Sequence, residues 1–103
     1  MILSPFEDDG MNRYHASKLF MGAAAIGERG VMQADVVLIQ AEQKLMDKAD
    51  QLVVLVDSSK FAASATFLVC ALSEVDIVIT DEAASEADIG MLKRHDIEVI
   101  IAH

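Results

Sequence analysis

Four short apolar runs, separated by longer mixed segments, predict four β-strands. They cover residues 19–21, 52–56, 77–79 and 97–101. The runs at 52–56 and 97–101 are rich in β-branched residues and alternate little between apolar and polar positions, which is typical of strands buried on both faces. The run at 77–79 is shorter but consists only of β-branched residues.

Two of the segments between these runs have the periodicity of amphipathic helices. The first is expected to begin with Asp35 as its N-cap and to end near Ala49, with Glu42 on its solvent-facing side. The second is expected to begin at Ser85, because Asp88 follows three residues later, as in a capping box. The expected inward positions of the two helices are Leu38, Ala41, Leu45 and Ala49, and then Ile89 and Leu92.

Strands that alternate with helices predict an α/β fold with a parallel, Rossmann-like sheet and right-handed crossovers. Residues 61–72 are ambiguous and fit an extended stretch followed by one helical turn. Residues 1–13 are expected to form an N-terminal loop that precedes a domain at 14–103. Ligands of such sheets bind beyond the carboxyl ends of the strands, so the residues at these ends are the candidates for a site.

Composition indicates a folded, acidic domain. The chain has 103 residues, 53% of them hydrophobic, which is enough apolar material for a packed core. Eight basic and 17 acidic residues give a net charge of −9, which repels nucleic-acid phosphates. We therefore expect that this chain does not itself bind DNA. An anionic ligand would need a local lysine or exposed backbone amides to bind it.

The sequence also bears on location and cofactors. A single cysteine, Cys70, allows no internal disulfide, and no apolar run reaches the ~20 residues that span a bilayer, so a cytoplasmic protein without membrane contact is expected. The histidines His15, His95 and His103 are scattered, and His95 fits a helix end better than a catalytic role. We expect no metal, no cofactor and no catalytic residue.

The strongest candidate site is the segment 57–60, directly after the strand at 52–56. Asp57 can accept hydrogen bonds from sugar hydroxyls, and Lys60 supplies a positive charge that suits a phosphate. Ser58 offers a hydroxyl, and the serine backbone amides can point at an anion. The alternative interpretation, equally supported by spacing alone, is a solvated turn in which Asp or Ser caps the next segment.

Three further residues are weaker candidates. Gly22 ends the first strand and would allow a ligand to approach the backbone closely, although a tight turn is the favoured interpretation. Asp81 ends the third strand and either contacts a ligand or, the favoured interpretation, caps the following turn. Glu42 is at best a contact reached across the crevice from an exposed helix face.

Several segments resemble one family. The sequence Leu-Val-Val-Leu-Val-Asp-Ser-Ser-Lys-Phe at 52–61 resembles the hallmark segment of the DeoR-type repressors, also called the DeoR/GlpR family. Residues 19–23 with the downstream Gly30 resemble the family's Phe-x-Gly-Ala segment, and residues 77–81 resemble its strand end (V/I)ITD. The helix around 41–46 fits between the first two. The departures are small: Ala62 and Asp96 stand where the family often has glycine.

The resemblance spans residues 14–102 and carries clear implications. It implies the C-terminal part of an effector domain with a ribose-5-phosphate isomerase-like fold, which senses phosphorylated sugars for a repressor of sugar-metabolism genes. DNA would be bound only through a winged helix-turn-helix absent from this chain. Carried over by position, Gly22, Asp57 and Lys60 are the best effector contacts, with Ser58, Asp81 and Glu42 weaker. A homo-oligomer is expected.

Three alternatives remain at this point. A sugar-phosphate isomerase-like enzyme would use Asp57 and Lys60 for proton transfer, but no second acid/base carboxylate with a supporting motif is present. A phosphoacceptor receiver domain would need an acidic pair after the first strand, where this chain has Gly-Ala-Ala. A structural role would make the domain mainly an oligomerisation module.

Overall fold

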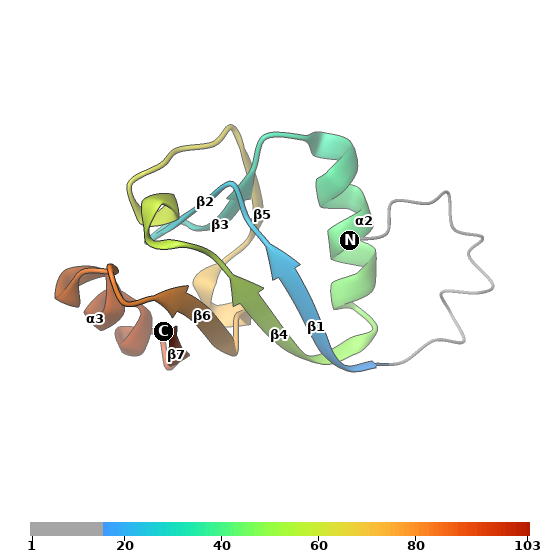
Figure 1. The fold of residues 1–103 in the computed structure, drawn as a ribbon. Coiled ribbons are helices and arrows are strands. Elements are labelled where there is room, and N and C mark those ends of the chain that lie inside the picture. Colours follow the sequence, from blue (N-terminus) through green and yellow to red (C-terminus); the bar gives the residue numbers. More distant parts are fainter. Residues whose placement is uncertain (1–15) are drawn as a thin grey trace.

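The computed structural model describes residues 16–103, so the expected N-terminal loop at 1–13 lies outside the described part. Four strands form a parallel sheet in the order β1-β4-β6-β7 (Figure 1). They are β1 (Ala16–Gly22), β4 (Ala49–Leu55), β6 (Ile77–Asp81) and β7 (Glu98–Ala102). Each expected strand overlaps one of them, which confirms the parallel α/β architecture.

After β1 the chain forms two strands of a second sheet and then helix α2 (Val36–Met46), which leads into β4. Asp35 is its N-cap, as expected, and accepts a 2.9 Å hydrogen bond from the amide of Val37. The inward-facing positions expected for this helix were partly wrong, because the residues of α2 that are fully buried are Ile39 and Glu42. These positions lie three residues apart and share one helix face, which packs against both sheets.

The second sheet is small, antiparallel and was not expected. It consists of β2 (Ala25–Gly27), β3 (Gly30–Gln33) and β5 (Phe67–Cys70), in that order. The stretch at 61–72 is thus extended in β5 and then turns helically in η2 (Leu72–Glu74), as expected. Gly30 has a φ of 126°, and a Cβ there would lie 2.1 Å from the carbonyl oxygen of Cys70, so this position requires glycine.

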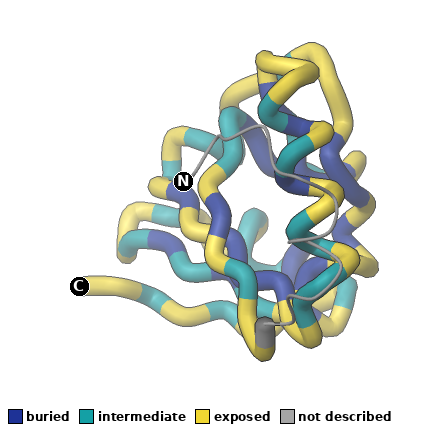
Figure 2. The backbone as a smooth tube through the Cα atoms, turned by 90° about the vertical axis from the view of Figure 1, so that its right-hand side faces the viewer, coloured by how far each residue is buried: buried dark blue, intermediate teal, exposed yellow. Residues whose placement is uncertain are grey.

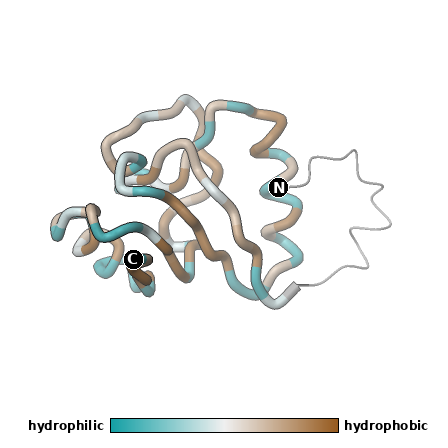
Figure 3. Tube along the Cα trace, in the orientation of Figure 1, coloured by the Kyte–Doolittle hydropathy of each residue, from teal (hydrophilic) through white to brown (hydrophobic). Residues whose placement is uncertain are grey.

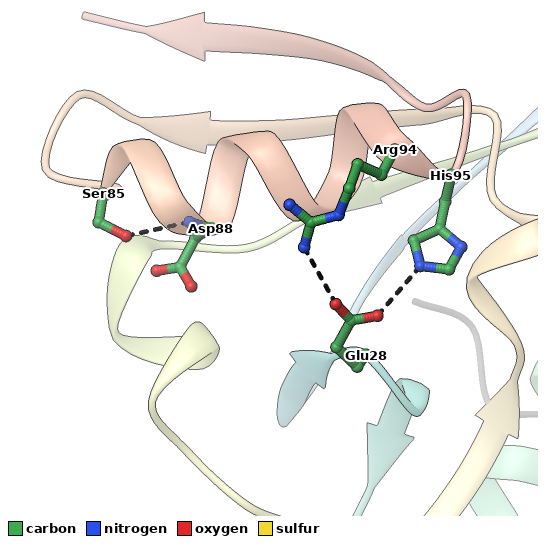
Figure 4. A network of polar contacts seen from close by, with 5 residues as sticks. All are labelled: Glu28, Ser85, Asp88, Arg94 and His95. Atoms are coloured by element: carbon green, nitrogen blue, oxygen red, sulfur yellow. Dashed lines mark hydrogen bonds and ion pairs between the residues drawn. The ribbon is translucent and has the colours of Figure 1, made fainter.

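Helix α3 (Glu86–Arg94) joins β6 to β7 and begins where the sequence predicts. Ser85 is its N-cap and accepts a 3.1 Å hydrogen bond from the amide of Asp88 (Figure 4). At its other end, Glu28 of the β2–β3 turn binds Arg94 at 3.2 Å and His95 at 3.1 Å (Figure 4). His95 therefore has the helix-end position expected of it.

The contacts of Glu28 with the Arg94 guanidinium group and the His95 ring connect the small sheet to the end of α3. They lower the pKa of Glu28, chiefly through the His95 hydrogen bond. Beyond His95 the chain reverses through Asp96, whose φ of 60° is left-handed. Aspartate tolerates this conformation better than most residues, which explains how it replaces a terminal glycine here.

Within the described residues, one face of the main sheet is covered and the other, its open face, leaves several apolar side chains exposed. Buried residues of β1, β4 and β6 belong to a single hydrophobic core with residues of both helices and the small sheet. Figure 2 marks the buried stretches along the backbone. On the opposite face three hydrophobic side chains are exposed to solvent: Phe20 is 58% exposed, Leu55 44% and Ile100 41%. Figure 3 shows the hydropathy along these strands. Neither α2 nor α3 is long and apolar enough to be a membrane-spanning helix.

Candidate functional site

The ends of three parallel strands meet at one edge of the main sheet. Gly22 pairs in register with Leu55, and Leu55 pairs with Ile79 of β6. Because the strands are parallel, Gly22, the 57–60 turn and Asp81 all lie at the carboxyl edge. Residues from three separate segments of the sequence are thus brought together where a ligand of such a sheet binds.

Asp57 stabilises the turn that follows β4. This turn is the 3-10 helix η1 (Ser58–Phe61), and Asp57 is its N-cap, accepting a 2.9 Å hydrogen bond from the amide of Ser59. The hydroxyl of Ser59 also donates to the same oxygen, Oδ1. These bonds lower the pKa of Asp57, with the side chain of Ser59 the largest cause. Asp57 is therefore an exposed carboxylate that already has a capping role.

Asp81 joins the ends of β6 and β4. Its Oδ2 accepts a 2.8 Å hydrogen bond from the amide of Ser58, and its Oδ1 accepts one of 2.9 Å from the amide of Ala83. The pKa of Asp81 is lowered, first by the Ser58 amide and then by the Ala83 amide. The favoured capping interpretation is confirmed, and the bond to Ser58 adds a link between strands that the sequence did not reveal.

These bonds correct one expectation about anion binding. The amides of Ser58 and Ser59 were expected to point at an anion, but Asp81 and Asp57 accept their hydrogen bonds. The amide of Lys60 is also engaged, at 3.1 Å from the carbonyl of Asp57. An anion at this turn would instead meet the Lys60 ammonium group, whose charge also lowers the pKa of Asp57.

Gly22 is exposed and its backbone does not require glycine. Its φ lies outside the left-handed region, unlike that of Gly30. A Cβ at Gly22 would meet the carbonyl oxygen of Leu55 at 3.7 Å, an ordinary van der Waals distance. Glycine is therefore not needed for the bend between β1 and β2, and close approach of another group to the backbone stays a prediction.

Glu42 is buried, which corrects the expectation of an exposed helix face. It is 1% exposed, and burial raises the pKa of its carboxyl group. Its Oε2 accepts a 3.4 Å hydrogen bond from Nε2 of Gln33, while Oε1 is buried without a hydrogen-bond partner among the described residues. The same Nε2 of Gln33 donates to the carbonyl oxygen of Gly22 at 3.0 Å.

Gln33 is the residue that the sequence analysis missed. It lies at the end of β3 and is 7% exposed, and it connects Glu42 to the carboxyl edge through Gly22. A glutamine in a short strand carries no local signal of such a role. Only the packing of α2 and the small sheet against β1 places its amide between two acceptors.

The parallel sheet with alternating helices places the chain in the Rossmann-like α/β class. Residues 1–82 match the family model described as the DeoR C terminal sensor domain, and the chain belongs to this family. Similar proteins include the HTH-type transcriptional repressor GlcR of Bacillus subtilis (strain 168), 28% identical over 91 residues, covering 88% of this chain. The resemblance identified from the motifs is thus confirmed.

Two further relatives are regulators by name. The putative aga operon transcriptional repressor of Escherichia coli O157:H7 is 28% identical over 95 residues, 91% of this chain. The HTH-type transcriptional regulator UlaR of Shigella dysenteriae serotype 1 (strain Sd197) is 28% identical over 87 residues, 84% of this chain. The matched region covers 35% of each of these three relatives, so the chain spans about a third of their length.

Proposed function

We propose that this chain is the effector-sensing part of a cytoplasmic DeoR-type regulator of sugar-metabolism genes, and that its effector is a phosphorylated sugar. The hydrogen bond from the amide of Ser58 to Asp81 carries this proposal. It holds the ends of β4 and β6 together beside Gly22 and so builds one polar edge from three strand ends. Family membership and the names of the relatives support a regulatory role.

Each residue of this edge has a distinct role in the proposal. Lys60 pairs with the phosphate, because on a chain of net charge −9 an anion needs a local cation. Asp57 accepts hydrogen bonds from sugar hydroxyls, and the Ser58 hydroxyl adds a polar contact. Gly22 lets the ligand approach the strand end closely. Asp81 holds the turn in place, since both of its oxygens are already engaged.

The regulatory step follows from thermodynamic linkage. An effector shifts a regulator between DNA-binding and non-binding states only if it binds those states with different affinity. DNA contact is proposed to occur through a helix-turn-helix outside this chain, in line with the HTH names of two relatives and with the acidic charge found here.

Isothermal titration calorimetry of the full-length protein tests the effector. The panel contains sugar phosphates, the matching unphosphorylated sugars and inorganic phosphate. We expect one sugar phosphate to bind at least about tenfold tighter than its unphosphorylated form, a difference of ~1.4 kcal/mol. Absence of binding by every sugar phosphate would contradict the proposal.

An isomerase-like enzyme is the alternative function, and the electrostatics disfavour it. A general base works best with a pKa near the working pH, whereas the pKa of Asp57 is lowered by its hydrogen bonds to Ser59. Glu42 has a raised pKa but is 1% exposed and so is closed to a substrate. NMR of sugar phosphates incubated with the protein decides the matter, because aldose–ketose conversion would establish an enzyme.

Self-association is a second role that one observation favours. The open face of the main sheet exposes Phe20, Leu55 and Ile100, and water-exposed apolar area of this kind favours a covering partner. We propose that a second copy covers it. Light scattering should show a dimer or higher oligomer that Phe20→Lys dissociates. An oligomer unaffected by this change would place the interface elsewhere, and a monomer would exclude it.

A further inference from the structure

The side chain of Gln33 joins two groups that the sequence places far apart. Its Nε2 donates both to the carbonyl oxygen of Gly22, at 3.0 Å, and to Oε2 of Glu42, at 3.4 Å. Both partners are acceptors, so the amide nitrogen, which carries two N–H donors, must point toward them. The Glu42 carboxylate thus helps to hold the Gln33 amide in the orientation that caps Gly22.

The stability of the fold does not explain this arrangement. Glu42 is 1% exposed, one of its oxygens lacks a partner among the described residues, and its other hydrogen bond is long. A buried acceptor without a partner costs free energy, so its presence in a native protein calls for an explanation, and a functional role is one. The under-bonded Glu42 carboxylate contacts Gln33, and Gln33 in turn is hydrogen-bonded to Gly22, the end of β1 that pairs with Leu55 at the effector edge.

We propose that Gln33 is a positioning residue of the effector site, which holds the Gly22 end of β1 in place while Glu42 orients its amide. This inference rests on the proposed function. The amide ties the end of β1 to β3 and α2, so the spacing between Gly22 and the 57–60 turn depends on it. A sugar that bridges Gly22 and Lys60 would sense this spacing, whereas inorganic phosphate, which needs Lys60 alone, would not.

The chain offers a matched set of variants. Gln33→Met keeps the volume and removes both hydrogen bonds. The exchange Gln33→Glu with Glu42→Gln keeps the composition and a hydrogen bond between the two positions but leaves an acceptor facing the carbonyl of Gly22. Gln43→Met is the control, because Nε2 of Gln43 donates at 2.9 Å to the carbonyl of Val69 in β5, which is not part of the carboxyl edge of the main sheet.

The experiment compares calorimetric affinities of the full-length variants for the best sugar phosphate and for inorganic phosphate at pH 8. We expect Gln33→Met and the exchanged pair to bind the sugar phosphate about tenfold more weakly or worse, and to bind inorganic phosphate like the wild type. Gln43→Met should bind both normally. Circular dichroism melting identifies any variant that fails to fold. If Gln33→Met fails to fold, the exchanged pair still tests the proposal.

Each other outcome has a definite meaning. If the wild type binds the sugar phosphate and the exchanged pair binds it equally well, the positioning role is overturned and the proposed function stands. If both ligands weaken in parallel, Gln33 is merely structural. If the wild type binds no sugar phosphate, the proposed function fails, and the positioning role fails with it.

Discussion

The amide of Ser58 donates a 2.8 Å hydrogen bond to Oδ2 of Asp81, across 23 positions of sequence. Through this bond the end of β6 sets the position of the turn after β4. Asp81→Ala removes it together with the cap on Ala83, so we expect a lower melting temperature and weaker effector binding. Asp81→Asn keeps one oxygen acceptor and should lose less of both.

Calorimetry and thermal melting of the two Asp81 variants check this expectation. Glu82→Ala is a suitable control, because Glu82 is exposed and its carboxylate pairs with His103 at 2.8 Å, not with the turn after β4. Asp81→Ala with unchanged effector affinity would show that the turn does not need this support for binding.

Gly22→Ala separates backbone need from ligand approach. The methyl group would lie 3.7 Å from the Leu55 carbonyl, so we expect the stability to change by less than about 1 kcal/mol. Effector affinity should fall, because the added carbon occupies the space through which the ligand approaches. Gly27→Ala, which meets no atom within 4 Å, is the control. Normal effector binding by Gly22→Ala would remove Gly22 from the site.

Lys60→Met tests the phosphate contact. It keeps most of the aliphatic stem and removes the charge, so affinity for the phosphorylated sugar should fall about tenfold or more. The unphosphorylated sugar should bind as before, and the dependence of affinity on salt concentration should weaken. Lys93→Met, in the last turn of α3, is the charge-matched control. Equal losses for both sugars would argue against a phosphate-specific role of Lys60.

Glu42→Gln should stabilise the protein at high pH and not at low pH. The folded pKa of Glu42 is raised above its ordinary value of 4.5, so ionisation is less favourable in the folded chain than in the unfolded one. The penalty is absent below about pH 4.5 and grows as the pH rises through the raised folded value. Relief of a buried, under-bonded carboxylate is worth about 1–3 kcal/mol.

Urea unfolding of the wild type and of Glu42→Gln between pH 4 and pH 8 measures this difference. The two curves of unfolding free energy against pH should diverge upward through the range. A constant difference at every pH would mean that the pKa of Glu42 is the same in the folded and the unfolded chain, so that its burial carries no charge penalty.

Much of the main sheet was predictable because its signals are local. The β-branched runs at 52–56, 77–79 and 97–101 mark strands wherever they pack, and Asp35 and Ser85 cap their helices with bonds to the next few residues. The second sheet was not predictable, because β2 has 3 residues and β3 and β5 have 4 each. Strands this short show no alternation, and their pairing depends on distant partners.

The candidate site was predictable in part, for the same reason. Gly22, the 57–60 turn and Asp81 each follow an apolar run, and parallel pairing brings such ends to one edge. The burial of Glu42 was not, because a helix surrounded on one side by two sheets buries a different stripe from a helix on one sheet. Gln33 gave no signal at all, since its role lies in two long-range hydrogen bonds.

The sequence by itself determined the α/β order, the family and the strand ends, because these depend on local composition and on short motifs. Only the tertiary structure decided which polar groups are engaged with one another. The amides of Ser58 and Ser59 are committed to Asp81 and Asp57, and the Glu42 carboxylate is enclosed. Burial and hydrogen-bond geometry are properties of the packed chain, so they became visible only when the two sheets and α2 were brought together.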